Sequence, residues 1–106
     1  PALQVQLGIS ISLKEERTCS FYTGGTEKYP AAGRARDLKG ILRAGDWNRM
    51  RIEARGDTFT VWLNGEQVTR YKDARFAGPG PIGLQVHPKL TMKVEFRDVR
   101  IRAIAP

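Results

Sequence analysis

The sequence predicts an all-β domain whose antiparallel strands form a β-sandwich. Apolar and polar residues alternate with a period of two in several separate runs. Turns rich in glycine, proline or asparagine separate these runs, and no segment sustains the period of a helix. About seven short strands joined by such turns are typical of a sandwich.

The first two predicted strands lie before residue 24. Every odd position from 3 to 13 is apolar and the intervening positions are small or polar, which is typical of a strand with one buried face. A turn at residues 14–16 leads to a second predicted strand at residues 18–23. Residues 24–46 show no sustained period, and we interpret them as a surface excursion of the chain.

The most specific local signal is the dipeptide Asn64-Gly65. Alternation over residues 49–55 and 58–63 predicts two paired strands before it, and residues 66–71 predict a strand that runs back. Asn-Gly favours a two-residue type I′ turn because both of its positions need positive φ. The sequence therefore predicts three consecutive antiparallel strands here.

The last two predicted strands follow a Gly-Pro-Gly-Pro break at residues 78–81. Residues 82–87 alternate, and Pro88 ends this strand because proline has no amide donor. Over residues 92–101 the apolar positions change from even to odd, which would turn half of the strand outward. We expect a bulge or bend at Arg97-Asp98 to absorb this change.

The length of 106 residues and the hydrophobic content of 41% suit one domain over residues 1–106. The net charge of +7 is spread along the chain and interleaved with acids, as in residues 49–55. This distribution favours a solvated basic surface over a nucleic-acid site, while docking on an acidic polymer is a weaker alternative. No apolar run approaches the roughly 20 residues of a membrane helix, so we expect no membrane contact.

The residues that could hold a metal or cofactor are few. The chain has one histidine, one cysteine and scattered acids, without the spacing of a zinc or calcium site. No glycine-rich phosphate loop and no serine elbow are visible. We expect no metal and no cofactor, and we predict that Cys19 is a small core residue.

Four short motifs resemble, in this order, the G-x-W-N, L-N-G, I-G-L-Q-x-H and F-R-[ND]-[IV] signatures of the 3-keto-disaccharide hydrolase family. They are Gly45-Asp46-Trp47-Asn48, Leu63-Asn64-Gly65, Ile82-Gly83-Leu84-Gln85-Val86-His87 and Phe96-Arg97-Asp98-Val99. The resemblance implies a concanavalin-like jelly roll of bacterial origin, of which this chain is the C-terminal part. It also implies a periplasmic or secreted parent protein.

The candidate site residues follow from strand parity and from this resemblance. Gln85 and His87 alternate with the apolar residues of their strand, so they face away from the core. His87 is the side chain whose unperturbed pKa suits proton transfer near neutrality, although a surface histidine before a proline is an equally open interpretation. The predicted site has His87 and Gln85 as catalytic residues and Gln4, Gln6 and Arg97 as substrate-binding residues, since amides and guanidinium groups suit sugar hydroxyls.

Two functions are consistent with these residues. The resemblance implies a hydrolase or lyase that acts on 3-keto-glycosides. The alternative is a non-catalytic carbohydrate-binding or adhesion module, because Gln4 stands where the family has a glutamate and one fold hosts many functions. The alternation starts at the first residues, and the resemblance implies further N-terminal strands, so we also expect self-association or a complementing segment at an uncovered sheet edge.

Overall fold

The computed structural model describes residues 3–7, 9–10, 15–23, 29–78, 82–84 and 95–104. Its strands are all paired antiparallel, and the helices within these ranges are two 3₁₀ turns, so the predicted all-β class is confirmed. None of the described helices is long and apolar enough to cross a membrane. The elements are β1 (Gln4–Val5), β2 (Ile9–Ser10), β3 (Glu15–Glu16), β4 (Phe21–Tyr22), η1 (Ala31–Gly33), β5 (Met50–Arg55), β6 (Thr58–Leu63), β7 (Glu66–Lys72) and η2 (Ala74–Phe76).

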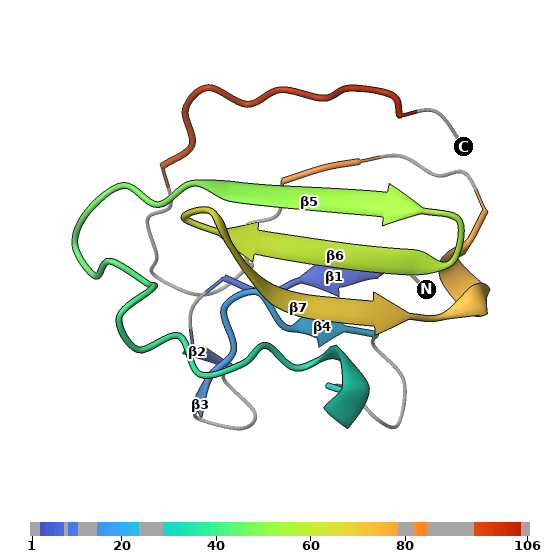
Figure 1. Ribbon diagram of the computed structural model, residues 1–106, viewed down its shortest axis with the longest axis horizontal. Helices are drawn as coiled ribbons and strands as arrows, with labels where there is room; N and C mark the ends of the chain where they lie inside the picture. The colour runs from blue at the N-terminus through green and yellow to red at the C-terminus, as the bar shows by residue number, and fades with distance from the viewer. Residues whose placement is uncertain are drawn as a thin grey trace, which may run out of the picture.

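The largest sheet is the predicted meander of β5, β6 and β7 (Figure 1). Asn64 and Gly65 have φ values of 52° and 88°, so the expected turn with two positive φ angles joins β6 to β7. The pairing of β6 with β7 slips between Val61 and Trp62, where Val68 is the additional residue on β7. This bulge keeps the side chains of Val61 and Val68 buried.

The core lies between this meander and the β1–β4 pair, which Figure 1 shows behind it. The ring of Phe21 on β4 lies 6.0 Å from that of Phe59 on β6 and stacks at 5.4 Å on that of Tyr71 on β7. Cys19 is fully buried in the same cluster, as predicted. Two layers of antiparallel strands thus enclose one hydrophobic core, as in a sandwich.

The described part of the connection between β4 and β5 is mostly exposed, as predicted, but some of its residues also pack against the core. Tyr29 and Gly33 are buried, and Leu38 and Leu42 pack against the core. A Cβ at Gly33 would lie only 3.2 Å from Phe21 Cβ, so the chain approaches the core closely there. The segment contacts the core through a 3₁₀ turn and isolated turns, which is why its apolar residues show no regular period.

The N-terminal strands are shorter than predicted. The alternation over residues 3–13 corresponds to β1, which pairs with β4, and to β2, which pairs with β3. Glu15 and Glu16 therefore belong to a strand and not to the expected turn. A turn at Thr18 and Cys19, where Cys19 has a φ of 68°, delays the next strand until Phe21. A positive φ at a cysteine has no clear sequence signal.

The C-terminal strands are not formed in the described residues. Residues 82–84 and 95–104 carry no strand pairing, while residues 85–94 lie outside the described ranges. Ile82 and Ile101 are 76% and 73% exposed, so these alternating residues bury no face. A segment with alternating apolar residues forms a strand only when another segment pairs with its backbone. The predicted bend is present, with a φ of 54° at Asp98.

Candidate functional site

The predicted substrate-binding glutamines lie in the β1–β4 layer. Gln4 pairs with Tyr22, and the backbone of Gln6 bonds to Ser20 and Cys19 at 2.9 and 2.8 Å. The Gln6 side chain donates from Nε2 to the carbonyl oxygen of Leu7 at 3.3 Å. Both glutamines are half-buried. Gln85 and His87 lie outside the described residues, so the catalytic pair stays a prediction.

Two asparagines from separate motifs form a polar junction where β5 begins and β6 ends. Asn64 Nδ2 donates to Asn48 Oδ1 at 2.9 Å and to the carbonyl oxygen of Ile41 at 2.7 Å. Arg49 N donates to Asn64 Oδ1 at 2.9 Å, and Asn48 Nδ2 donates to the carbonyl oxygen of Arg43 at 2.9 Å. The side chains of Asn48 and Asn64 thus tie the incoming loop to the hairpin turn, which is a structural role.

A third motif reaches the same end of the sheet through Arg97. The guanidinium carbon of Arg97 lies 4.1 Å from the centre of the Trp47 ring, which is a cation–π contact. Trp47 adjoins Asn48 in the sequence, so residues of three motifs meet here. We call Trp47, Asn48, Asn64 and Arg97 the motif junction.

A surface hollow of about 480 Å³ opens beside the motif junction, lined by Gly45, Asp46, Trp47 and Glu95. Trp47 is 41% exposed, and Asp46 Oδ1 accepts a hydrogen bond from the Trp47 amide at 2.7 Å. An aromatic ring beside a guanidinium and two carboxylates can pack on a sugar and bond to its hydroxyls. Over the ranges that the structure describes, no three His, Cys, Asp or Glu side chains gather closely enough to hold a metal ion.

Comparison of the sequence with known families identifies the family to which the chain belongs. A model described as the 3-keto-alpha-glucoside-1,2-lyase-like domain matches residues 2–102. The chain belongs to this family. No curated protein and no solved structure matches the chain. In this lyase-like domain, residues from three separate stretches of the family pattern therefore contact one another at the motif junction.

The sequence interpretation missed Asp46 and Glu95 as lining residues of the hollow. Each is adjacent to, or inside, a family motif, which is the one signal that could have indicated them. The sequence alone could not place Glu95 beside Asp46, because that proximity depends on where residues 95–104 lie relative to β5. The contact of Trp47 with Arg97 supports a structural role for Trp47 in holding that segment.

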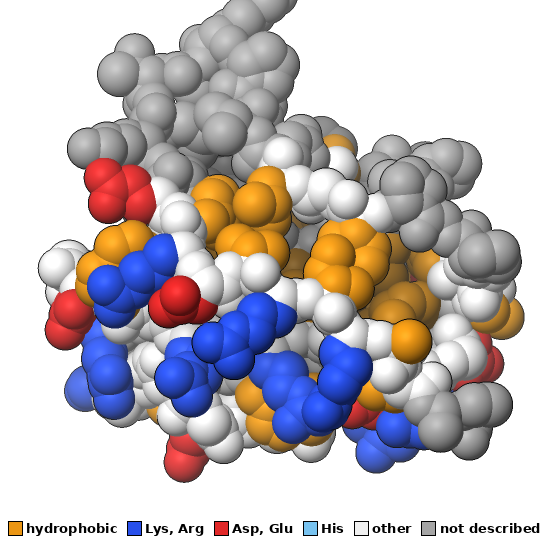
Figure 2. All heavy atoms as spheres, turned by 90° about the horizontal axis from the view of Figure 1, so that it is seen from above, with side chains coloured by type: hydrophobic (Ala, Val, Ile, Leu, Met, Phe, Trp, Pro, Cys, Tyr) orange, Lys and Arg blue, Asp and Glu red, His pale blue; other side chains and the backbone are white. Residues whose placement is uncertain are grey.

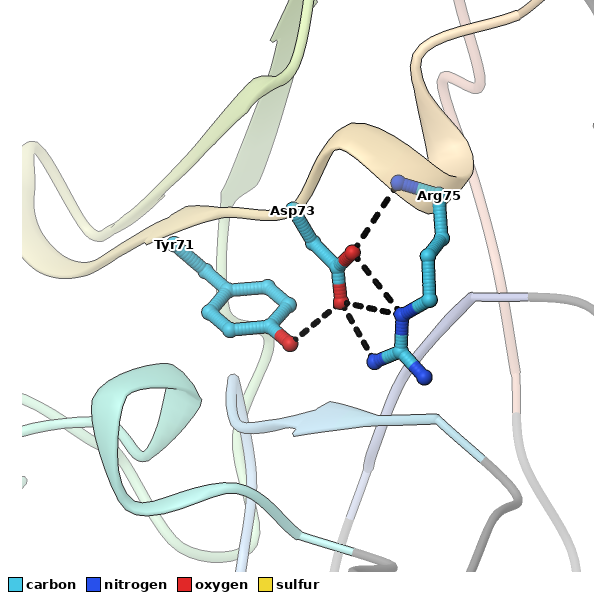
Figure 3. Close-up of polar contacts among 3 residues, drawn as sticks. All are labelled: Tyr71, Asp73 and Arg75. Carbon is cyan, nitrogen blue, oxygen red and sulfur yellow. Dashed lines mark hydrogen bonds and ion pairs between the residues drawn. The ribbon is translucent and has the colours of Figure 1, made fainter.

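A second polar cluster closes the far end of β7 (Figure 3). Tyr71 Oη donates to Asp73 Oδ2 at 2.6 Å, and Arg75 Nη2 donates to the same oxygen at 2.6 Å. Asp73 Oδ1 accepts from the Arg75 amide at 3.0 Å, so Asp73 caps η2. Because each of these bonds serves the fold, we assign the cluster a structural role.

The same contacts shift two pKa values in opposite directions. The hydrogen bonds from Arg75 and then from Tyr71 hold the pKa of Asp73 well below its usual range. Burial, followed by the hydrogen bond to Asp73, raises the pKa of Tyr71. A carboxylate with a depressed folded-state pKa stabilises the fold above its unfolded pKa of about 3.9, and this stability is lost as pH falls toward the folded value.

We therefore expect Asp73→Asn to lower the urea midpoint at about pH 7 and to flatten the fall in stability between about pH 5 and pH 2. Asp57→Asn is the matched control, since Asp57 reaches Lys72 only at 4.0 Å and an exposed pair contributes little. Urea titrations at several pH values measure both effects. An unchanged pH profile in Asp73→Asn would show that the cluster does not couple stability to pH.

Proposed function

We propose that this domain cleaves the glycosidic bond of a 3-keto-glycoside, a sugar whose C3 hydroxyl has been oxidised to a ketone. The observation that carries the proposal is the family match over residues 2–102. The hollow beside the motif junction supports it, because its lining presents an exposed aromatic ring and two carboxylates, and the Arg97 guanidinium contacts that ring.

The chemistry of the substrate explains how a site with few catalytic groups can suffice. The ketone at C3 acidifies the proton on C2, so a base can remove this proton and leave an enolate. The enolate electrons then form a C1–C2 double bond while the C1–O bond breaks, and the departing alcohol takes a proton. Addition of water to that double bond gives the hydrolysed sugar. Ordinary glycosidases need two carboxylates, whereas this route needs one base.

Our assignment gives each predicted residue one role in this route. His87 removes the C2 proton, and the Gln85 amide bonds to the ketone side of the sugar. Gln4, Gln6 and Arg97 bind hydroxyl groups of the substrate. Arg97 is exposed, and its guanidinium contacts the ring of Trp47, which lines the hollow.

The test is turnover of a 3-keto-glycoside by the His87→Ala variant. We expect a loss of about 10²–10⁴-fold in kcat, the usual contribution of a general base. The free energy of unfolding should change by less than about 0.5 kcal/mol, since the alternation of the sequence predicts that the side chain faces away from the core.

Arg102→Ala is the control for this experiment, because Arg102 is exposed and outside the proposed machinery. It should turn over substrate like the parent chain. Full activity of His87→Ala would remove His87 from the mechanism, and an unfolded His87→Ala protein would mark it as a core residue.

A non-catalytic carbohydrate-binding module is the second candidate, and the presence of Gln4 favours it. The amide of Gln4 on β1 cannot act as an acid or base in place of the family's glutamate. Binding of the 3-keto-glycoside without turnover, unchanged in the Gln4→Glu variant, would support this module and exclude the enzyme.

A further inference from the structure

The side of the β5–β6–β7 sheet that faces away from the core carries side chains that the proposed function does not use. Phe59, Val61 and Leu63 of β6 belong to the hydrophobic core, so the alternate residues of β6 lie on the opposite side, where Thr60 is itself buried. The strand register extends this side into three rows across the sheet. The rows are Arg51, Trp62 and Gln67; Glu53, Thr60 and Arg70; and Arg55, Thr58 and Lys72. We call these nine residues the outer face.

The outer face is basic and contains one aromatic ring. The guanidinium carbon of Arg51 lies 4.9 Å from the centre of the Trp62 ring. Glu53 is the one acid among the nine residues, and it lies 3.6 Å from Arg51 and 3.2 Å from Arg55. Figure 2 looks onto the edge of the sheet on the side of β5 and residues 95–104, and Lys and Arg side chains are also frequent there. Alternate residues of each strand face the same side of the sheet, so basic residues from β5 and β7 come together on the outer face.

The existing ion pairs leave these cations available to a ligand. The side chains of Arg51 and Arg55 are 61% and 52% exposed, and exposed pairs contribute little to stability. A ligand carboxylate can therefore replace or share the contact with Glu53. Arg70 and Lys72 are exposed on β7, on the other side of β6 from these arginines.

We propose that the outer face binds an acidic polysaccharide built of uronic acid units. Trp62 is the platform on which a sugar ring packs, and Arg51, Arg70 and Lys72 bind carboxylates on the chain. The amide of Gln67, which pairs with Trp62 across the strands, bonds to hydroxyl groups beside the ring. Three strands spaced about 4.8 Å apart and three rows about 6.7 Å apart give room for a short oligosaccharide.

The arrangement favours an acidic glycan over a nucleic acid. Glu53 lies in the middle row between two arginines, where it would repel a closely spaced phosphate chain. Single-stranded nucleic acid is bound by successive aromatic rings, whereas the outer face has Trp62 alone among its nine residues. A uronic acid chain carries one carboxylate per sugar, with hydroxyl groups between the carboxylates. This spacing suits the outer face, where cationic side chains lie among neutral polar ones.

This surface is distinct in its residues from the hollow at Trp47, so polymer binding and cleavage of a 3-keto-glycoside are independent properties. A chain that binds polymer without turnover, or the reverse, separates the two proposals. In this arrangement the outer face holds a larger glycan, while the proposed catalytic site acts on a 3-keto-glycoside.

The experiment measures binding of polygalacturonate, neutral dextran and oligo(dT) by calorimetry at low and moderate salt. We expect polygalacturonate to bind best, with an affinity that falls as salt rises, and dextran to bind at least about tenfold more weakly. Trp62→Ala should weaken polygalacturonate binding about tenfold or more, as loss of one stacking platform does elsewhere. Arg70→Gln should weaken it several-fold.

Arg43→Gln is the matched control, since Arg43 is exposed and lies outside the sheet. It removes the same charge and should leave affinity within about twofold of the parent chain. Trp62 is half-buried, so Arg70→Gln, at an exposed position, decides the matter if Trp62→Ala does not fold. An equal loss in Arg43→Gln and Arg70→Gln, equal binding of dextran, or tighter binding of oligo(dT) would each overturn the proposal.

Discussion

Replacing Phe21 by alanine should lower the free energy of unfolding by about 3–5 kcal/mol, the usual cost of removing a buried aromatic side chain. Phe21 is 1% exposed and its ring contacts Phe59 and Tyr71, so it joins the two layers of the sandwich. The total stability of a domain of this size is about 5–15 kcal/mol. The variant should therefore lose a large fraction of its stability.

Urea denaturation followed by tryptophan fluorescence measures this effect. Ile82→Ala is the control, because Ile82 is 76% exposed and its truncation should cost within about 0.5 kcal/mol. Phe21→Leu keeps most of the apolar volume and should fall between the two if the alanine variant does not fold. A loss in Ile82→Ala as large as that in Phe21→Ala would contradict the core described here.

The central hairpin could be predicted from sequence because its signals are local. Alternation specifies the strands β5 and β6, and the pair Asn64-Gly65 specifies the turn that joins β6 to β7, without reference to distant residues. Burial of Cys19 was also predictable from its residue type. These features form wherever the local preferences and the overall fold agree.

The rest of the fold depends on contacts between distant residues. The connection before β5 covers the core because Gly33 allows close approach to Phe21 and Tyr71, which no local pattern indicates. Residues 95–104 alternate like a strand yet pair with none in the described ranges, because pairing depends on a partner and not on alternation. The positive φ of Cys19 shortened the second predicted strand for a similar reason.

The candidate site was predictable only in part. The role of Arg97 in substrate binding stays a prediction, and its contact with Trp47, which lines the hollow, was not foreseen. Alternation along each strand indicated which side chains point away from the core. It could not show which strands are neighbours, and the row of Arg51, Trp62 and Gln67 exists only because β5 and β7 both flank β6.

The proposed chemistry also predicts a strong preference for the oxidised substrate. Without the C3 ketone, the carbanion at C2 has no carbonyl to accept its electrons, so elimination from C1 is blocked. We expect kcat/KM for a 3-keto-glucoside to exceed that for the parent glucoside by at least about 10³-fold, or about 4 kcal/mol of barrier. Both substrates carry the same leaving group, so the ratio does not reflect a difference in leaving-group ability.

The most direct test is incubation of the purified chain with a 3-keto-glucoside and, in parallel, with its unoxidised parent. Release of the leaving alcohol is followed by chromatography, and a conjugated enone intermediate by ultraviolet absorbance. We expect rapid release from the 3-keto-glucoside and none from the parent. Equal release from both substrates, or no release from the 3-keto-glucoside by a chain that binds it, would contradict the proposed function.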